Sequence, residues 1–285
     1  MNECQQKNVQ PFLKWAGGKR QLLPVLREYF PTQYEDYYEP FVGAGAVLFD
    51  LMPEKAFIND VNEQLVNVYE TIKDNVTELV EQLRFHAEHH EKEYYYEIRA
   101  WDRSEKITKL SDVERAARIL YLNKTCFNGL YRVNSKGQFN VPFGKYKNPN
   151  IVNEDVLRAV STYLNSIQFK ITNTDFEEAV TSAKRGDFVY FDPPYDPLNE
   201  TSSFTSYAQG GFGKEEQVRL RDCFVKLAER GCTVMLSNSY TPFIQELYKD
   251  FHIETVQASR SINSKGSARG KIPEAVVIFD GQNEK

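Results

Sequence analysis

The chain has 285 residues, of which 41% are apolar and 26% are charged, and its formal net charge is −5. This composition excludes an intrinsically disordered chain and suits one or two domains with a buried core. No apolar run approaches the roughly 18 residues of a membrane span, and the polar N-terminus predicts no export.

The first part of the chain alternates between helical and extended patterns. Apolar spacing and turn residues predict a helix over 19–30, a strand over 37–42, a helix ending near 51, a strand over 55–58 and a helix over 62–73. Such alternation is typical of a doubly wound α/β sheet.

This alternation stops in the middle of the chain. Residues 78–122 are predicted to be helical and polar, and Ser111 and Glu114 form a predicted capping box at the start of the last helix. A loop and hairpin follow over 127–148, with a turn at Asn134–Gly137. We therefore expect an inserted helical module at this point.

Alternation returns after residue 150. The pattern predicts a strand over 167–172, a helix over 176–184, a strand over 188–191, a helix over 215–230, a strand over 233–236 and a hairpin formed by 253–258 and 275–279. The expected organisation is one α/β domain made of residues 1–63 and 150–285, interrupted by a module over 64–149.

Two segments are basic although the whole chain is acidic. Neither contains Asp or Glu, and local positive charge rather than the total charge binds phosphate. The alternative is an ordinary solvated face. The cations are Lys124, Arg132, Lys136, Lys145 and Lys147 in 123–150, and Arg260, Lys265, Arg269 and Lys271 in 259–271.

The sequence Asp192-Pro193-Pro194-Tyr195 directly follows the apolar strand predicted over 188–191. Proline restricts the backbone and supplies no amide donor, which leaves carbonyls available as acceptors. A carboxylate, a fixed carbonyl and an aromatic face can together hold a planar ring that bears an amino group. A chance turn sequence is the alternative.

The first strand-to-helix turn contains Gly43-Ala44-Gly45, which allows a ligand to approach the backbone above a helix N-terminus. Asp60 ends the next predicted strand, where an acid can accept hydrogen bonds from ribose hydroxyls. Leu48 stands where a dinucleotide-binding turn carries its third glycine. The turn therefore favours a nucleoside cofactor over a dinucleotide, and a dehydrogenase is the less favoured reading.

Five blocks in this order resemble the Dam-type DNA adenine-N6 methyltransferases, including those that accompany GATC-cutting restriction enzymes. The similarity spans about residues 10 to 280. The blocks are Lys14-Trp15-Ala16-Gly17-Gly18-Lys19, Glu39-Pro40-Phe41-Val42-Gly43-Ala44-Gly45, Asn128-Gly129-Leu130-Tyr131-Arg132, Phe139-Asn140-Val141-Pro142-Phe143-Gly144 and Asp192-Pro193-Pro194-Tyr195.

The resemblance implies a Rossmann-like methyltransferase sheet that uses S-adenosyl-L-methionine, with an inserted helical target-recognition domain that carries a β-hairpin. It implies that Asp192, Pro193 and Tyr195 hold a flipped target adenine. The cofactor residues that it implies are Trp15, Lys19, Gly43, Gly45, Asp60, Asp175, Phe176 and Asp192.

The resemblance further implies that the inserted module reads GATC in double-stranded DNA. Arg132 matches an arginine that reads a guanine, and Phe127 stands where relatives often have a tyrosine that enters the duplex; phenylalanine lacks its hydroxyl. The residues expected to contact DNA are Lys14, Phe127, Asn128, Leu130, Arg132, Asn134, Lys136, Pro142 and Lys145.

Neither histidines nor cysteines indicate a metal site. His86, His89 and His90 lie on a predicted helix among polar residues, and we expect a solvated face with no metal. The four cysteines lack Cys-x-x-Cys spacing, which predicts reduced thiols in a cytoplasmic protein.

Several readings stay open on the sequence. Methylation of cytosine N4, of RNA adenine or of a protein glutamine is a rival activity, and a DNA-binding protein without activity is another class. Residues 201–207, followed by Gly210, Gly211 and Gly213, suit either a lid or an ordinary loop. The chain leaves open whether a restriction endonuclease accompanies it, and whether it acts as a monomer.

Overall fold

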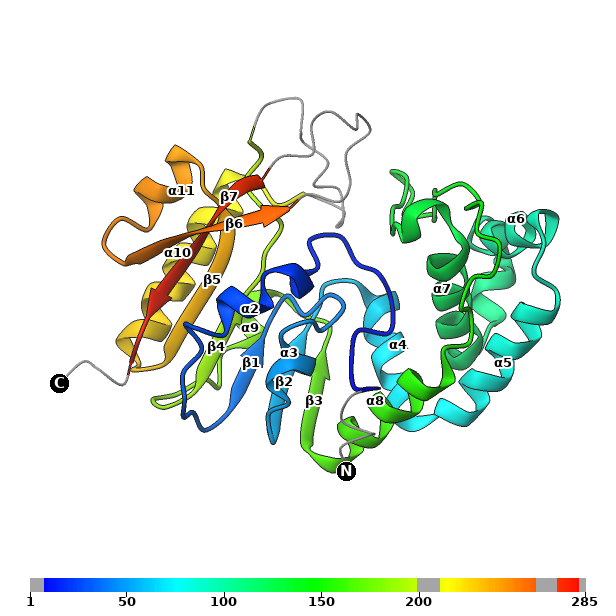
Figure 1. Cartoon of the computed structure of the whole chain (residues 1–285), viewed down its shortest axis with the longest axis horizontal. Helices are drawn as coiled ribbons and strands as arrows, with labels where there is room; N and C mark the ends of the chain where they lie inside the picture. The colour runs from blue at the N-terminus through cyan, green and yellow to red at the C-terminus, as the bar shows by residue number, and fades with distance from the viewer. Residues whose placement is uncertain (1–7, 199–210, 260–270, 282–285) are drawn as a thin grey trace. The chain divides into compact units, whose positions relative to one another are not determined.

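The computed structural model describes residues 8–198, 211–259 and 271–281. It contains a seven-stranded sheet of order β3-β2-β1-β4-β5-β7-β6 (Figure 1). The proposed lid residues 201–210 and most of the second basic segment, 260–270, lie outside the described residues. The strands are β1 (Tyr37–Glu39), β2 (Lys55–Asn59), β3 (Gln168–Thr172), β4 (Phe188–Phe191), β5 (Thr233–Ser239), β6 (His252–Ser259) and β7 (Lys271–Phe279).

The pairing of the strands is mostly parallel. β1 pairs in parallel with β2 and β4, and β4 pairs in parallel with β5. β7 runs antiparallel to both β5 and β6, which confirms the hairpin predicted at the end of the chain. All four residues of β4 are buried, as expected for a central parallel strand covered on both faces.

The chain forms two compact units. One consists of residues 1–18, 43–54 and 60–173, and the other of residues 19–42, 55–59 and 174–285. Their boundaries lie near strand ends, whereas the domains expected from the sequence were 1–63 with 150–285, and 64–149. Those functional boundaries remain a prediction.

The second unit has a core in which α10 (Lys214–Glu229) packs against β5. Leu220 and Phe224 of α10 are fully buried there. The helix predicted over 19–30 is wrong in its extent: it is a 3-10 turn, η1 (Lys19–Gln21), followed by α2 (Leu23–Leu26), and Pro24 lies in the first turn of α2. The remaining helices of this unit are α9 (Phe176–Ala179) and α11 (Pro242–Leu247).

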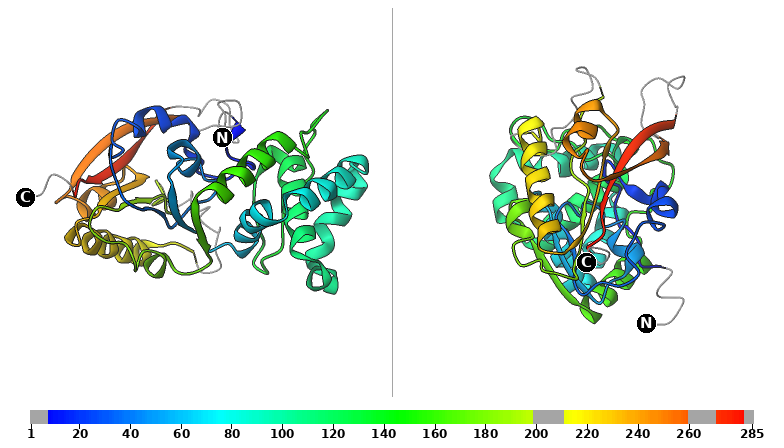
Figure 2. Two further views of the ribbon diagram at one scale, coloured as in Figure 1. Left: turned by 90° about the horizontal axis from the view of Figure 1, so that it is seen from below. Right: turned by 90° about the vertical axis from the view of Figure 1, so that its left-hand side faces the viewer.

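The first unit is mainly helical, as the cyan and green helices in Figure 2 show. In it, α7 (Asp112–Thr125) packs against α4 (Glu63–Asp74), α5 (Val76–Glu88) and α6 (Lys92–Ala100). The predicted capping box is confirmed, because Ser111 and Glu114 each bond the other's backbone amide at the start of α7. The helices of this unit are α3 (Leu48–Leu51), α4 (Glu63–Asp74), α5 (Val76–Glu88), α6 (Lys92–Ala100), η2 (Trp101–Arg103), η3 (Glu105–Lys109), α7 (Asp112–Thr125), η4 (Phe127–Gly129) and α8 (Glu154–Ser166).

One expectation about the histidines is wrong. His86 is buried rather than solvated, since its ring stacks on Tyr121 at 5.0 Å between centroids and its Nδ1 lies 2.7 Å from the Tyr94 hydroxyl. Burial lowers the pKa of His86 to about 4, so the imidazole is neutral at physiological pH. The aromatic residues that bury it come from α6 and α7.

Neither a membrane span nor a metal cluster is found in the described part of the chain. None of its helices combines the length and apolar character needed to cross a membrane. No three His, Cys, Asp or Glu side chains there gather as metal ligands would. That the protein needs no metal stays a prediction.

Candidate active site and nucleic-acid interface

Asp192 lies at the carboxyl end of β4, directly after four buried residues. Its Oδ1 is 2.6 Å from Nζ of Lys19, a lysine whose side chain is only 3% exposed. Burial raises the pKa of Asp192 to about 6, the Lys19 charge opposes that shift, and the Glu274 charge adds to it. The carboxylate is therefore held as a charged acceptor at neutral pH.

The Tyr195 ring lies beside this ion pair. Nζ of Lys19 is 4.6 Å from the ring centroid, within the range of a cation–π contact. The Tyr195 hydroxyl donates a hydrogen bond of 2.8 Å to Oε2 of Glu274, on β7. Lys19, Asp192, Tyr195 and Glu274 thus form one charged, partly buried cluster.

A polar network supports the two-proline segment. Gln217 of α10 donates to the carbonyl of Pro194 at 2.9 Å, and Asn238 of β5 in turn donates to Gln217 at 3.0 Å. Asn238 also accepts from the amide of Asp196 at 3.0 Å. These hydrogen bonds hold the Pro194 carbonyl and the Asp196 amide, so the backbone after Asp192 is fixed.

In the first unit, the glycine turn and Asp60 are joined directly. The amide of Gly43 donates to Oδ2 of Asp60 at 3.1 Å, and the amide of Asn62 donates to Oδ1 at 2.9 Å. Burial raises the pKa of Asp60 to about 6 against these two hydrogen bonds. A carboxylate accepts about four hydrogen bonds, so Asp60 retains capacity for ligand hydroxyls.

The turn needs glycine at both predicted positions. Gly43 has φ +50° and Gly45 has φ +70°, in the left-handed region. A Cβ on Gly43 would lie 2.9 Å from Cδ1 of Trp15, and one on Gly45 would lie 2.6 Å from the Tyr69 hydroxyl. The absence of side chains allows Trp15 to lie against the turn, where it also stacks on Tyr131 at 4.7 Å.

Asp175 and Phe176 open α9 in the second unit. Asp175 caps the helix by accepting from the amide of Glu177 at 3.0 Å, and it pairs with Arg219 at 2.9 Å. Phe176 is buried and contacts the Phe41 ring at 5.5 Å between centroids. Asp175 therefore has structural partners already, and its role toward a cofactor stays a prediction.

The segment that contains Phe127 to Leu130 is attached to Lys14. The Asn123 side chain bonds both the amide and the carbonyl of Lys14, at 2.9 and 2.8 Å, and also the carbonyl of Gly129 at 3.1 Å. A Cβ on Gly129 would clash with the Lys14 side chain. This close contact places Lys14 beside the exposed Phe127 and Asn128.

Residues 132–140 turn back on themselves without forming a named strand, and the β-hairpin expected in the inserted module stays a prediction. The ladder within this loop is a single antiparallel bridge between Val133 and Phe139. Asn134 closes the turn, because its Oδ1 accepts from the amides of Lys136 and Gln138, both at 3.0 Å. Arg132, Lys136, Pro142 and Lys145 are exposed, and the Arg132 guanidinium bonds the carbonyl of Asn140 at 2.6 Å.

A buried ion pair between Arg118 and Asp102 supports this loop through a hydrogen bond to its backbone. Arg118 of α7 is 1% exposed and pairs with Oδ2 of Asp102 at 2.8 Å. The same Asp102 oxygen accepts from the amide of Phe139 at 2.7 Å, and Arg103 donates to the Phe139 carbonyl at 2.7 Å. The loop is thereby attached to the helical part of its unit.

The sequence reasoning missed Asp102, Arg118, Glu274 and Tyr146. Tyr146 is an exposed aromatic whose ring lies 5.7 Å from Nζ of Lys14. The basic segment 123–150 was a signal that could have drawn attention to Tyr146. The other three interact with residues far away in the chain, so local patterns do not reveal them.

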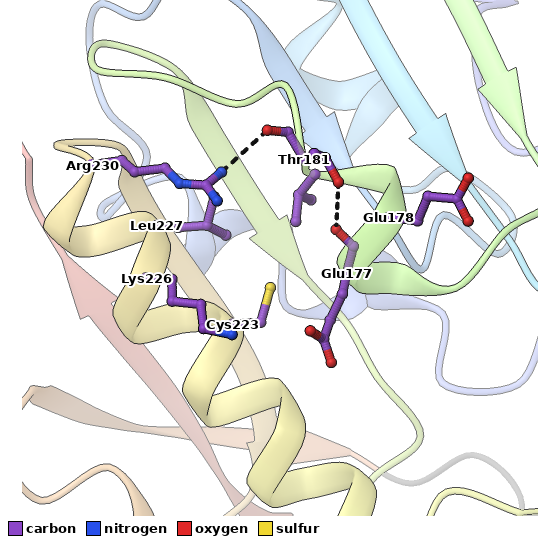
Figure 3. Close-up of a pocket in the computed structure, with 8 residues that line it drawn as sticks. Glu177, Glu178, Thr181, Cys223, Lys226, Leu227 and Arg230 are labelled. Carbon is purple, nitrogen blue, oxygen red and sulfur yellow. Dashed lines mark hydrogen bonds between the residues drawn. The ribbon is translucent and has the colours of Figure 1, made fainter.

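A separate pocket of about 290 Å³ lies between α9 and α10 and contains none of the predicted site residues (Figure 3). Cys223 lines it, and Arg230 there bonds the carbonyl of Thr181 at 3.2 Å. Burial raises the pKa of Cys223 to about 12, so the thiol stays protonated. The cysteines at 126, 223 and 232, those that the structure describes, are all buried and free.

Comparison with known proteins gives a consistent result. Residues 15–262 match the family of D12 class N6 adenine-specific DNA methyltransferases. The chain is 55% identical over 274 residues to the type II methyltransferase M1.LlaDCHI of Lactococcus lactis subsp. cremoris, covering 96% of each. It is 46% identical to the type II methyltransferase M.MjaIII of Methanocaldococcus jannaschii, covering 92% of this chain and 95% of the relative. It is 34% identical to the DNA adenine methylase of Escherichia coli strain K12, covering 96% of each.

Proposed function

Because this chain belongs to the D12 class of N6 adenine-specific DNA methyltransferases, we propose that it methylates the adenine of GATC in duplex DNA. The general activity, DNA adenine-N6 methyl transfer, follows from the family. The GATC target is our proposal, and it is supported by the Arg132 loop and by the blocks shared with the Dam-type enzymes. The enzyme would act in the cytoplasm.

The family implies S-adenosyl-L-methionine as methyl donor, and the residues of the chain suit it. The donor supplies an electrophilic methyl group on a sulfonium. Asp60 keeps acceptor capacity for ribose hydroxyls, and the bare Gly43 backbone leaves room beside Trp15. We propose that the donor is bound by Trp15, Lys19, Gly43, Gly45, Asp60, Asp175, Phe176 and Asp192.

We propose that Asp192 and the Pro193 carbonyl accept the two N–H bonds of the adenine amino group. Accepting these two hydrogen bonds would draw the nitrogen toward tetrahedral geometry and direct its lone pair at the sulfonium methyl. The N–C bond would form as the C–S bond breaks, with a neutral thioether as the leaving group, and the surplus N6 proton would leave through the Asp192 carboxylate that accepts it. Negative charge on Asp192 also stabilises the positive charge that grows on N6. The Lys19 ion pair supports this role, because it keeps the carboxylate ionised at neutral pH.

The target amino group lies inside the duplex, so the adenine must leave the base stack. Base flipping costs a few kcal/mol, and stacking on the Tyr195 ring would offset part of that cost. Lys14, Phe127, Asn128, Leu130, Arg132, Asn134, Lys136, Pro142 and Lys145 are proposed to hold and read the DNA. Phe127 supports this, since its aromatic ring is 52% exposed and can enter a duplex.

The residues 64–149 are proposed to act as the target-recognition domain, and 1–63 with 150–285 as the catalytic domain. We also propose that the enzyme belongs to a type II restriction-modification system with a cognate endonuclease. Two of the relatives are type II methyltransferases by name, which supports this proposal.

The test is transfer of tritiated methyl groups from S-adenosyl-L-methionine to duplexes with GATC and with one-base variants. Product nucleosides are then separated to distinguish N6-methyladenine from N4-methylcytosine. We expect N6-methyladenine in GATC alone, and turnover reduced by orders of magnitude in Asp192→Ala with DNA binding retained.

The matched control for that variant is Asp222→Ala, which removes an exposed acid of α10 that pairs with Arg221. It should retain wild-type turnover. Equal methylation of every duplex would refute the GATC proposal, and near-normal turnover in Asp192→Ala would refute the role of that carboxylate.

A further inference from the structure

Glu274 is fixed at a defined place in the sheet. It lies in β7 between two antiparallel neighbours, opposite Ser239 of β5 and Val256 of β6. Its backbone is therefore held on both sides, and its Oε2 accepts the hydroxyl of Tyr195 at 2.8 Å. A rigid strand thus holds the far end of the Tyr195 side chain.

The Tyr195 ring is restrained at three points. Its hydroxyl bonds Glu274, its face lies 4.6 Å from Nζ of Lys19, and its backbone follows Pro194, whose carbonyl accepts from Gln217. Burial and the charges of Asp192 and Glu274 raise the pKa of Tyr195 well above its usual value. The phenol therefore remains a donor to Glu274 over the whole physiological pH range.

We propose that Glu274 is a positioning residue whose carboxylate fixes the Tyr195 ring in the plane against which the target adenine stacks. The proposal rests on the proposed function, because it needs the flipped base to meet Tyr195. Removing the carboxylate would free rotation of the phenol. The base would then spend less time aligned for reaction, and alignment is a major source of catalytic rate.

The charge of Glu274 has a second effect, on Asp192. The charged or titratable groups that act on Asp192 among the described residues are Lys19, Tyr190, Tyr195 and Glu274, with Glu39 acting on Tyr190. Asp192 must be ionised to act as a charged acceptor for its N–H bond of the adenine amino group, so activity should fall as pH drops through about 6. Because the Glu274 charge raises the pKa of Asp192, its removal should move that fall to lower pH.

The experiment compares Glu274→Gln, Glu274→Ala, Tyr195→Phe and the double variant Glu274→Ala/Tyr195→Phe. For each, kcat, KM for a GATC duplex and the pH dependence of kcat are measured, with the thermal midpoint as a check of folding. Glu246→Gln is the matched control, since it removes an exposed acid of α11.

Glu274→Ala and Tyr195→Phe should each lower kcat about tenfold, the size expected for a hydrogen bond to a charged group. Because both remove the same hydrogen bond, the double variant should be no slower than either single variant. Glu274→Gln keeps a hydrogen-bond acceptor for the Tyr195 hydroxyl, so this variant should retain most of the wild-type kcat at pH 8. The fall of its kcat on the acid side of the pH profile should occur at lower pH than in the wild type.

Wild-type kcat in Glu274→Ala, or multiplicative losses in the double variant, would overturn the proposal. The proposal would also be overturned if kcat of Glu274→Gln fell at the same acid pH as kcat of the wild type. If Glu274→Ala does not fold, the kcat of Tyr195→Phe and the pH profile of Glu274→Gln still test whether Glu274 positions the Tyr195 ring. A wild-type enzyme without activity on GATC duplexes would instead refute the proposed function, which separates the two failures.

Discussion

At the scale of single residues, the Lys19–Asp192 pair determines what the site can do. A buried carboxylate without a partner would be protonated at neutral pH and would lose the negative charge with which it is proposed to accept one N–H bond of the adenine amino group. The pair at 2.6 Å opposes this burial effect. The resemblance implied that Lys19 contacts the cofactor and that Asp192 contacts both the cofactor and the target base, and the structure brings the two side chains into direct contact.

Arg132 and Lys136 offer a test of base reading at the same scale. Arg132→Ala removes a guanidinium able to make two hydrogen bonds to guanine, worth roughly 1–3 kcal/mol of discrimination. We expect the variant to methylate one-base variants of GATC with less penalty than the wild type. The measurement is kcat/KM on GATC and on each one-base variant.

Lys136→Ala is the matched comparison, since Lys136 is exposed at the tip of the same loop. A phosphate contact carries no base information, so this variant should bind all duplexes more weakly. The slope of the logarithm of the binding constant against the logarithm of salt concentration should fall in magnitude by about one. If Arg132→Ala lowered methylation of every duplex by the same factor, Arg132 would not read a base.

At the scale of elements, α7 supports the loop over 132–140 through Asp102 and Arg118. Asp102→Ala would leave the Arg118 guanidinium buried without its carboxylate, which costs roughly 3–5 kcal/mol. It would also remove the acceptor for the amide of Phe139. We expect a large loss in the free energy of unfolding, measured by urea denaturation.

Arg115→Ala is the control, because Arg115 lies on α7 like Arg118 and the substitution removes an exposed ion pair with Asp112. Exposed pairs contribute about 0–1 kcal/mol, so this variant should unfold nearly as the wild type does. Similar losses in the two variants would show that the buried pair has no special role in stability.

At the scale of the whole molecule, the proposed donor should stabilise the folded chain. A ligand present at a hundredfold excess over its Kd stabilises the native state by about 2.7 kcal/mol. We expect S-adenosyl-L-methionine to raise the thermal midpoint by several degrees, measured by differential scanning calorimetry. NAD is the control and should produce no shift, because Leu48 replaces the third glycine of a dinucleotide turn.

An equal shift with NAD, or no shift with S-adenosyl-L-methionine, would contradict the predicted cofactor. The outcome also tests the reading of the Gly43–Gly45 turn, which in the sequence is compatible with more than one nucleotide. Asp60→Ala should abolish the shift with S-adenosyl-L-methionine, because the proposed ribose contact would be lost.

Features that depend on neighbours along the chain could be predicted from the order of residues alone. The capping box at Ser111, the strand before Asp192 and the closing hairpin all follow from local patterns, and the structure confirms them. Periodicity and capping chemistry act over a few residues, so one sequence is enough to reveal them. The family was indicated by a different signal, the resemblance of five separated blocks to the Dam-type enzymes, and the match of residues 15–262 shows it.

Contacts between side chains that are far apart in the chain became visible in the folded protein. The Tyr195–Glu274 hydrogen bond joins residues 79 positions apart, and Asp102 reaches the amide of Phe139 across 37 positions. His86 is buried because aromatic residues of other helices cover it. Burial and pairing depend on what packs against a side chain, and that partner is chosen by the fold, so local sequence pattern does not contain it.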